Sequence, residues 1–235
     1  MIHVIRSEER YVSRHDWLTS RFSFSFAEYH DPSNLNWGAL RVLNDDTVQG
    51  GTGFGMHQHR DMEIISYIIE GALEHKDSMG NRGVIRAGEV QRITAGTGIY
   101  HSEYNHSETD PVHFLQIWVM PNQQGLTPSY SQKEFTKEQQ RNRLLPVVSG
   151  NPVDDAMLIN QDATFYLSNL EANQTITHRQ PEGRRMHLFV ISGSVSLEND
   201  DELQLRQGDA ARIKDVSELT LATAEGAEFL LIDLA

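Results

Sequence analysis

Short apolar runs separated by turns recur along most of the chain. Residues 64–69 and 112–120 are rich in β-branched and aromatic side chains, and they are closed by Gly71 and Pro121, respectively. Residues 22–26 alternate phenylalanine with serine, which is the period of a strand with one buried face. The pattern predicts a β-rich fold made of many short strands.

Two further segments carry weaker local signals. Residues 39–43 form a short apolar run, which we expect to end at a turn formed by the polar residues 44–46. Residues 132–142 are the main helical candidate. Because this segment is polar on nearly every face, we expect a short surface helix or a linker there.

The two halves of the chain share a pattern. In the first half an apolar run reaches Gly71, and Gly88 follows 17 residues later. In the second half a similar run reaches Gly193, and Gly208 follows 15 residues later. This predicts two β domains joined near the middle of the chain. We expect an N-terminal domain over residues 1–130, a linker over 131–150 and a C-terminal domain over 151–235.

Composition narrows the class of protein. The formal net charge is −13, and acidic residues flank the few basic groups, so we expect no direct binding to nucleic acid or to an anionic membrane. The chain has no cysteine, which excludes disulfides and thiolate ligands and leaves imidazole and carboxylate to hold any metal. With neither a signal-like N-terminal run nor an apolar segment of membrane-spanning length, we expect a cytoplasmic protein, and we expect a monomer.

Histidine is concentrated in one part of the chain, because six of the eleven histidines lie within residues 57–113. His57 and His59 are two positions apart, as are His101 and Glu103. On a strand, side chains at this spacing point to the same face. Two such strands, paired across a barrel, would bring four metal-binding side chains to one point.

The fourth ligand is left open by spacing alone, since Glu63 has the same parity as His57 on an unbroken strand. Three imidazoles and one carboxylate suit Fe, Mn, Co, Ni, Cu or Zn rather than Ca or Mg. Phe54, Met56 and Trp118 are candidates for apolar pocket walls or for core. The remaining histidines of this region are further candidates for lining the pocket, although we expect each of them on the surface or in the core; they are His75, His106 and His113.

The residues around these motifs resemble the two sequence motifs of the cupin superfamily. The second motif has Thr94 in the place of a proline and a longer spacing before His101, which is the variant found in pirins. The chain therefore resembles bacterial pirins, closely in its N-terminal half and more loosely in its C-terminal half. The matching positions are Gly51, His57, His59 and Glu63 in the first motif, Gly88, Thr94, Gly96, His101 and Asn105 in the second, and Trp17, 22–26, Asp31-Pro32 and 40–46 before them.

The resemblance implies an all-β bicupin, in which two β-barrel or jelly-roll domains with few short helices pack together. It also implies one divalent transition metal ion in the N-terminal barrel, with iron expected first and Zn, Mn, Ni, Co or Cu as alternatives. Pirins are described with three histidines and the glutamate two residues after the third, which here are His57, His59, His101 and Glu103. Glu63 would then orient a ligand imidazole from outside the coordination sphere. Nothing similar follows Gly208, so the C-terminal barrel is expected to hold no metal.

Bacterial pirins of this kind look like quercetin 2,3-dioxygenases. The resemblance therefore implies an enzyme that cleaves a flavonol such as quercetin with O₂ and releases carbon monoxide. Glu103 would act as the catalytic base for the enol hydroxyl. The main alternative is a non-enzymatic, iron-binding regulatory protein that acts through a protein partner, and a metal-dependent isomerase or other non-oxidative cupin is a third.

Overall fold

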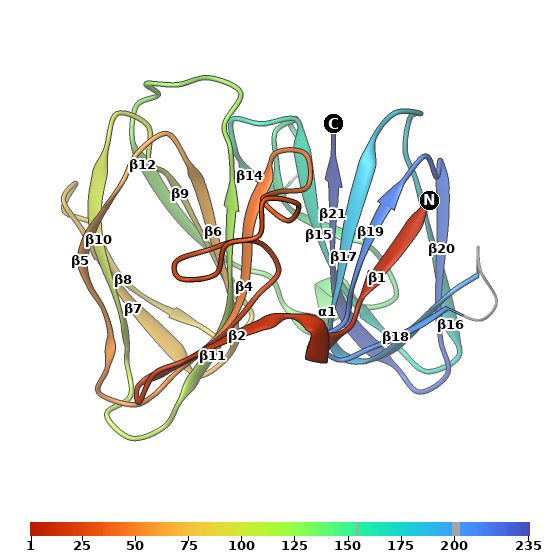
Figure 1. Ribbon diagram of the computed structural model, residues 1–235, viewed down its shortest axis with the longest axis horizontal. Coiled ribbons are helices and arrows are strands. Elements are labelled where there is room, and N and C mark those ends of the chain that lie inside the picture. Colours follow the sequence, from red (N-terminus) through yellow and green to blue (C-terminus); the bar gives the residue numbers. More distant parts are fainter. Residues whose placement is uncertain (154, 199–202) are drawn as a thin grey trace. The chain divides into compact units, whose positions relative to one another are not determined.

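The computed structural model describes residues 1–153, 155–198 and 203–235, and its secondary structure is almost entirely β (Figure 1). The chain divides into two compact units. We call residues 11–135 with 159–161 the N-terminal unit, and residues 1–10, 136–158 and 162–235 the C-terminal unit. The expected all-β bicupin is confirmed at the level of fold class.

The N-terminal unit contains two sheets. A seven-stranded sheet has the order β12-β9-β6-β11-β4-β3-β2, and a four-stranded sheet has the order β5-β10-β7-β8 (Figure 1). Ile68 and Phe114 of the larger sheet share one buried cluster with Leu73 and Ile85 of the smaller sheet, so the sheets pack face to face. The strands are β2 (Tyr11–Arg14), β3 (Leu18–Phe22), β4 (Leu40–Val48), β5 (Gly53–His59), β6 (Glu63–Glu70), β7 (Ala72–Asp77), β8 (Arg82–Arg86), β9 (Glu89–Thr94), β10 (Ile99–Asn105), β11 (Val112–Val119) and β12 (Ser129–Glu134).

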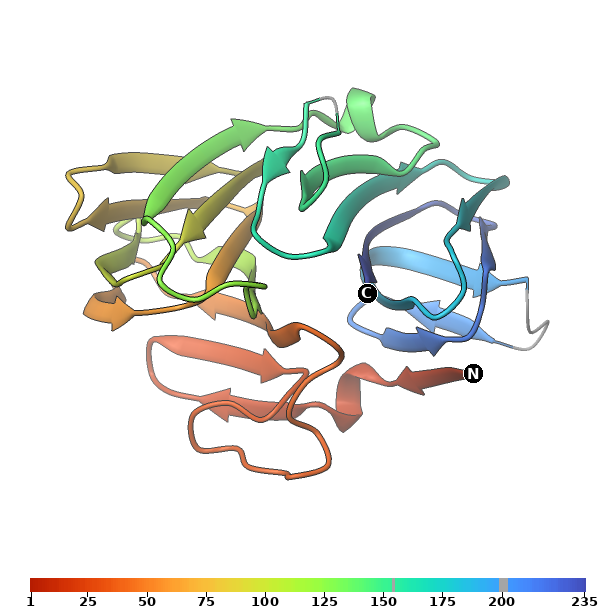
Figure 2. The same cartoon turned by 90° about the horizontal axis from the view of Figure 1, so that it is seen from above.

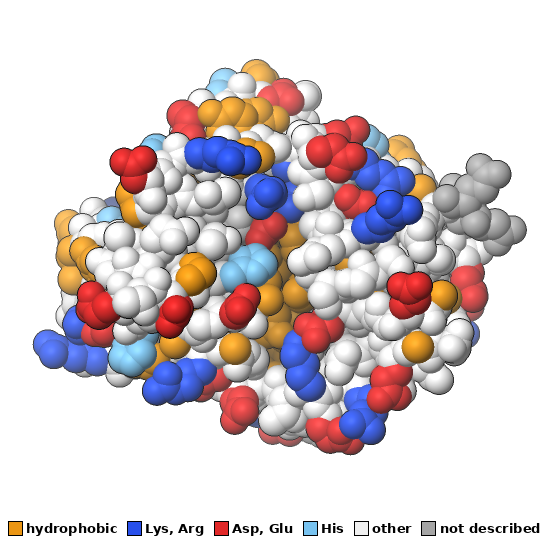
Figure 3. All heavy atoms as spheres, turned by 90° about the horizontal axis from the view of Figure 1, so that it is seen from below, with side chains coloured by type: hydrophobic (Ala, Val, Ile, Leu, Met, Phe, Trp, Pro, Cys, Tyr) orange, Lys and Arg blue, Asp and Glu red, His pale blue; other side chains and the backbone are white. Residues whose placement is uncertain are grey.

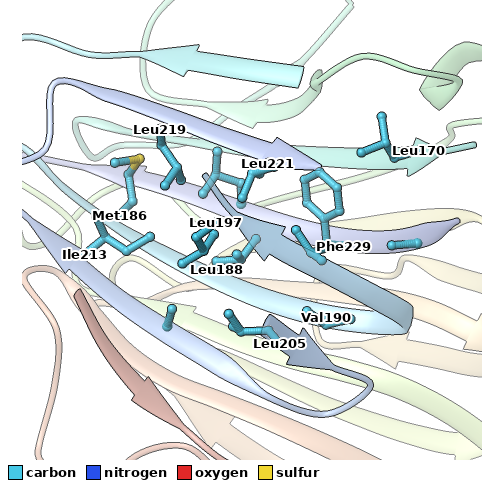
Figure 4. Close-up of a cluster of buried hydrophobic side chains, with 14 residues drawn as sticks. Leu170, Met186, Leu188, Val190, Leu197, Leu205, Ile213, Leu219, Leu221 and Phe229 are labelled. Carbon is cyan, nitrogen blue, oxygen red and sulfur yellow. The ribbon is translucent and has the colours of Figure 1, made fainter. Parts of the chain in front are cut away.

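The C-terminal unit is organised around the long strand β17, whose first part pairs with β19 and β21 and whose last part pairs with β18 and β20. Figure 2 shows its strands curving around a common centre, and Figure 4 shows the side chains that fill this centre, among them Leu188, Leu221 and Phe229. The elements are β1 (Ile2–Ile5), the 3-10 helix η1 (Ser7–Glu9), α1 (Lys137–Gln140), β13 (Leu145–Ser149), β14 (Met157–Leu158), β15 (Ala163–Leu170), β16 (Gln174–Arg179), β17 (Arg185–Leu197), β18 (Gln204–Arg206), β19 (Ala210–Lys214), β20 (Glu218–Thr223) and β21 (Ala227–Leu234).

Residues 159–161 belong to the N-terminal unit instead of the expected C-terminal domain, and the bounds differ more extensively in two other places. Residues 1–10 belong to the C-terminal unit, because β1 pairs antiparallel with β19. Residues 131–150, which we expected as a linker, contain part of β12, all of α1 and all of β13. Long-range strand pairing decides both differences, and local composition does not report such pairing.

The helix expected over residues 132–142 is reduced to the four residues of α1, which Thr136 caps by accepting a hydrogen bond from the Gln139 backbone N–H. The first part of the segment is β12 instead, paired with β9 from Ser129 to Glu134. The polar side chains of this part are compatible with an edge strand, and the ladder to β9 overrides their local preference.

Two local predictions on β3 and β4 are wrong. The alternating residues 22–26 leave the strand at Phe22, because the Ser25 hydroxyl donates to the Asp31 carbonyl and accepts from the Asp31 N–H, both at 2.8 Å. The turn expected at residues 44–46 is absent, and β4 continues to Val48. β4 is paired on both sides, with β3 and with β11, so its polar residues remain in the sheet.

Within the described residues, no helix combines the length and the apolar character needed to cross a bilayer.

Candidate metal centre

The three motif histidines come together on two neighbouring strands of the smaller sheet. His57 and His59 lie on β5, and His101 lies on β10 directly opposite His57. The ring centroids are 4.4 Å apart for His57 and His101, 4.8 Å for His59 and His101, and 4.7 Å for His57 and His59. One ligand nitrogen from each ring lies within 4.8 Å of the others, so a single ion can contact all three.

The state of these imidazoles fits metal binding. His101 is completely buried, and neither of its ring nitrogens has a hydrogen-bond partner among the described residues. Burial, with His57 nearby, lowers the pKa of His101 to about 3, and burial, with His101 nearby, lowers the pKa of His59 to about 3. A neutral imidazole is the form that coordinates a metal, and coordination would satisfy nitrogens that are otherwise costly to bury.

His57 has a defined orientation. Its Nδ1 lies 2.8 Å from the carbonyl oxygen of Gly55, so Nδ1–H donates there and Nε2 carries the lone pair. Metal-binding histidines commonly fix their second nitrogen in this way. The backbone of β5 therefore selects the tautomer that can bind an ion.

Glu103 reaches the site from β10 after a local irregularity. The register with β5 shifts between His101 and Glu103, so that Glu103 is opposite Phe54 rather than continuing the pairing. Its side chain is buried, and two amides of the facing sheet hold it. Gln91 Nε2 donates to Oε1 at 3.0 Å, and Gln116 Nε2 donates to Oε2 at 2.8 Å.

His75 approaches the cluster from β7, which flanks β10 on the side away from β5. It lies on β7 opposite Glu103, is fully buried, and together with His101 and Glu103 forms a second group of possible ligands whose donor atoms lie within 4.8 Å. Its Nε2 is 3.2 Å from Asp77 Oδ2, and its ring stacks on Tyr130 with centroids 4.7 Å apart. The pairing of β7 with β10 brings His75 here, and this pairing has no signal in the spacing of the motifs.

Glu63 lies apart from the histidine cluster. The parity argument needs an unbroken strand, but β5 ends at His59, Asp61 has φ 48°, and Glu63 begins β6 in the larger sheet. Thr94 Oγ1 donates to Glu63 Oε2 at 2.9 Å, and Asn160 Nδ2 donates to Oε1 at 2.8 Å. Burial raises the pKa of Glu63, and the two hydrogen bonds, which lower it, offset only part of this effect. Both carboxylate oxygens thus have partners other than imidazole.

A cavity of about 260 Å³ opens beside the cluster within the N-terminal unit. His57, His59 and Glu103 form part of its wall, and the Trp118 ring meets His59 edge-on at 4.8 Å. Two of the three expected apolar wall residues, Phe54 and Trp118, line it, whereas Met56 is 60% exposed. The other apolar residues of the wall are Leu18, Phe22, Phe26 and Ala27.

Comparison with known proteins agrees with this architecture. Residues 5–119 match the family described as Pirin, and residues 146–234 match the quercetinase C-terminal cupin domain. A protein from Zymomonas mobilis is 44% identical over 219 residues, which are 93% of this chain and 92% of that protein. The Escherichia coli protein named quercetin 2,3-dioxygenase is 39% identical over 100% of this chain and 99% of its own length. The chain belongs to the pirin family.

A solved structure gives this pirin a close structural counterpart. The bacterial pirin YhhW from Escherichia coli, in complex with nickel(II), superposes with a TM-score of 0.94 at 38% identity, covering 100% of this chain and 99% of that one. The name of the relative from the same species agrees with the expectation of an enzyme like quercetin 2,3-dioxygenase. In this pirin, both groups of possible metal ligands found among the described residues lie in the N-terminal unit.

Several residues of the site were missed from the sequence. Gln91 and Gln116 support Glu103, and Asn44 and Asp46 line the cavity where a turn was expected. The i, i+2 spacing of Asn44, Asp46 and the apolar Val48 was the signal that could have placed Asn44 and Asp46 on one face of a strand.

The surface of this pirin mixes both signs of charge. On the face in Figure 3, Lys and Arg side chains lie singly or in small groups among Asp and Glu, in keeping with the net charge of −13. The expectations that the chain does not bind nucleic acid and is monomeric stay predictions.

Proposed function

We propose that this pirin is a metal-dependent dioxygenase that cleaves a flavonol such as quercetin with O₂, and that His57, His59, His101 and Glu103 hold its metal ion. The observation that carries the proposal is a cluster of three adjacent imidazoles and a buried carboxylate, of which His57, His59 and Glu103 line a cavity with a largely apolar surface. Such a combination is typical of a site that binds a flat, weakly polar molecule next to a reactive ion.

A divalent transition metal held by these residues supplies Lewis-acid chemistry, which favours the deprotonated form of an enol hydroxyl. The four proposed ligands would leave one or two positions of a five- or six-coordinate ion open to substrate. Iron is the ion we propose first, and nickel is the ion bound by the Escherichia coli relative.

Glu103 is the group that we propose takes the proton of the enol hydroxyl. Amide N–H groups of Gln91 and Gln116 hold its two oxygens, and Ser66 Oγ donates at 2.9 Å to Gln116 Oε1, which fixes that amide in turn. Each carboxylate oxygen has a second lone pair, so accepting a proton does not require these hydrogen bonds to break. The carboxylate is thus oriented before the substrate arrives.

The aromatic walls bind the ring system and exclude water. Trp118 and Phe54 line the cavity together with His57 and His59, and Phe26 meets Trp118 edge-on with ring centroids 5.3 Å apart. In the proposed overall reaction, both atoms of O₂ enter the organic product, and one ring carbon leaves with its hydroxyl oxygen as carbon monoxide. The hydroxyl proton passes to Glu103 and then to solvent or product.

The test is O₂ uptake and carbon monoxide release with quercetin, using protein reconstituted separately with Fe, Mn, Co, Ni, Cu and Zn. His101→Ala is the inactive variant, and His106→Ala, which alters an exposed histidine, is its matched control. We expect turnover with at least one metal, loss of both metal and turnover in His101→Ala, and neither loss in His106→Ala. Stoichiometric metal without turnover of quercetin would overturn the proposed substrate, and full metal content in His101→Ala would overturn the ligand set.

A further inference from the structure

The inner face of β4 places two polar side chains in the cavity. Asn44 and Asp46 are each 3% exposed, and both line the cavity that the histidines and Glu103 also line. Across the sheet, Asn44 is opposite Gln116 on β11 and Asp46 is opposite Ser20 on β3. The larger sheet therefore presents a polar strip to the cavity, while His57 and His59 face it from the smaller sheet.

The amide of Asn44 has an acceptor that the protein does not use. Its Oδ1 is buried and has no hydrogen-bond partner among the described residues. A buried acceptor without a partner is costly, and native proteins rarely keep one in a well-packed core. A hydroxyl group of a bound ligand would satisfy it.

Asp46 and Ser20 extend the polar strip. The Ser20 hydroxyl donates to Asp46 Oδ1. Burial, followed by the charges of Asp45 and Glu103, raises the pKa of Asp46 to about 7 despite the Ser20 hydrogen bond. A substantial fraction of Asp46 therefore carries its proton near neutral pH, and in that form it can donate a hydrogen bond as well as accept one.

We propose that Asn44 and Asp46, supported by Ser20, recognise phenolic hydroxyl groups of the substrate, so that the site selects polyhydroxylated aromatic enols over unsubstituted ones. The inference rests on the proposed function, because it concerns the same cavity. The wall formed by His57, His59 and Glu103 would hold the enol, and the polar strip of the larger sheet would hold hydroxyl groups elsewhere on the ring system. A site built to bind a hydroxyl discriminates against an analogue that lacks it, because its own polar groups are then left without partners.

The experiment measures equilibrium binding of two flavonols to the metal-reconstituted protein by quenching of tryptophan fluorescence. One is quercetin, and the other is the flavonol that lacks the two hydroxyls on the pendant ring. The wild type is compared with Asn44→Leu, with Ser20→Ala, which perturbs the strip least, and with Thr47→Val, a matched control directly after Asp46 on the opposite face of β4. Circular dichroism and metal content verify that each variant folds.

We expect the wild type and Thr47→Val to bind quercetin at least about tenfold more tightly than the flavonol that lacks the two pendant-ring hydroxyls. In Asn44→Leu this ratio should approach one, through weaker binding of quercetin and unchanged binding of the other flavonol. Ser20→Ala should lower the ratio by about threefold, and it decides the question if Asn44→Leu does not fold.

Equal binding of both flavonols by the wild type, or an unchanged ratio in the folded strip variants, would overturn the inference even if both compounds are turned over. A clear difference in affinity between the two flavonols that the variants abolish, together with no O₂ uptake on any metal, would have a different meaning. It would support recognition of hydroxyl groups by the polar strip and would overturn the dioxygenase assignment.

Discussion

Burial controls the chemistry of individual side chains in this protein. His59 and His101 lose solvent on the inner face of the smaller sheet, which lowers the pKa of each to about 3 and keeps both rings neutral. Glu103 is buried too, but two amide donors accompany it. The same desolvation thus gives neutral ligands at two positions and leaves a hydrogen-bonded carboxyl group at the third.

Replacing Glu103 by Gln separates metal binding from proton transfer. The amide keeps the size of the side chain but cannot accept the enol proton, so we expect kcat with quercetin to fall by about 100-fold or more. Metal content at saturating metal should stay near that of the wild type, because the three imidazoles remain. Steady-state kinetics and metal analysis on the same preparations measure both quantities.

An exposed glutamate provides the control for this variant: Glu108→Gln should change neither quantity. Unchanged kcat in Glu103→Gln would remove Glu103 from the role of base.

His187, on β17 of the C-terminal unit, should make the stability of the protein depend on pH. Burial, with the charges of Arg212 and Arg10 nearby, lowers its pKa from 6.5 to about 3. Between these two pH values the unfolded chain binds a proton that the folded chain does not, so the free energy of unfolding decreases as pH falls below 6.5. The contribution of His187 should be about 2 kcal/mol smaller at pH 5 than at pH 7.

Urea unfolding at both pH values measures this difference. His187→Gln should lose about 2 kcal/mol less than the wild type between pH 7 and pH 5, whatever its absolute stability. His3→Gln, which changes an exposed histidine, should behave like the wild type. Equal pH dependence in wild type and His187→Gln would contradict the assignment.

The loop between β9 and β10 holds the two histidine strands in register. Gly96 has φ 46°, its carbonyl accepts a hydrogen bond from the Asp61 N–H just after β5, and the Thr97 N–H donates to the Leu126 carbonyl. A Cβ at Gly96 would collide with that carbonyl of Leu126. The backbone of the loop therefore links the end of β5 to the start of β10.

Gly96→Ala should consequently damage both stability and the metal site. We expect a loss of about 3 kcal/mol or more in the free energy of unfolding, from the left-handed backbone and the collision together. Metal affinity should fall as well, because β5 and β10 carry the histidines. Urea unfolding and metal titration measure the two effects.

Gly125 offers a matched control. It also has positive φ, 68°, but an added Cβ there would have no atom within 4 Å. Gly125→Ala should cost only about 1–2 kcal/mol and leave metal affinity unchanged. Equal effects of the two substitutions would show that the Leu126 contact does not hold the loop.

The beginning and the end of the chain fold together in the C-terminal unit. Ile2 and Val4 pack against its core, and β1 extends its sheet beside β19. Arg6 Nη1 donates to Asp209 Oδ2 at 2.8 Å, and the Ser7 N–H donates to Asp209 Oδ1 at 2.9 Å. Contacts separated by some 200 residues in sequence thus complete this unit.

Val4→Asp should loosen the C-terminal unit without changing the metal site. Placing a carboxylate against the apolar core should cost about 2 kcal/mol or more, and amide hydrogen exchange should speed up in β19 and β17. Exchange in β5 and β10, and the metal content, should not change. His3→Asp, at the neighbouring exposed position, should have no effect; faster exchange in β5 and β10 with Val4→Asp would contradict the division into units.

The sequence by itself determined the strands and the histidine motifs. A period of two and β-branched composition are local properties, so the strands over residues 64–69 and 112–120 could be predicted, and the resemblance to pirins pointed to His57, His59 and His101. These signals report which face of its own strand a side chain occupies.

Only the tertiary structure decided which strands face one another. It brought Gln91 and Gln116 to Glu103, took Glu63 into the other sheet, and turned Asn44 and Asp46 into the cavity. Strand pairing, bulges and sheet packing join residues far apart in the chain, and their energy comes from contacts that no local window of sequence contains.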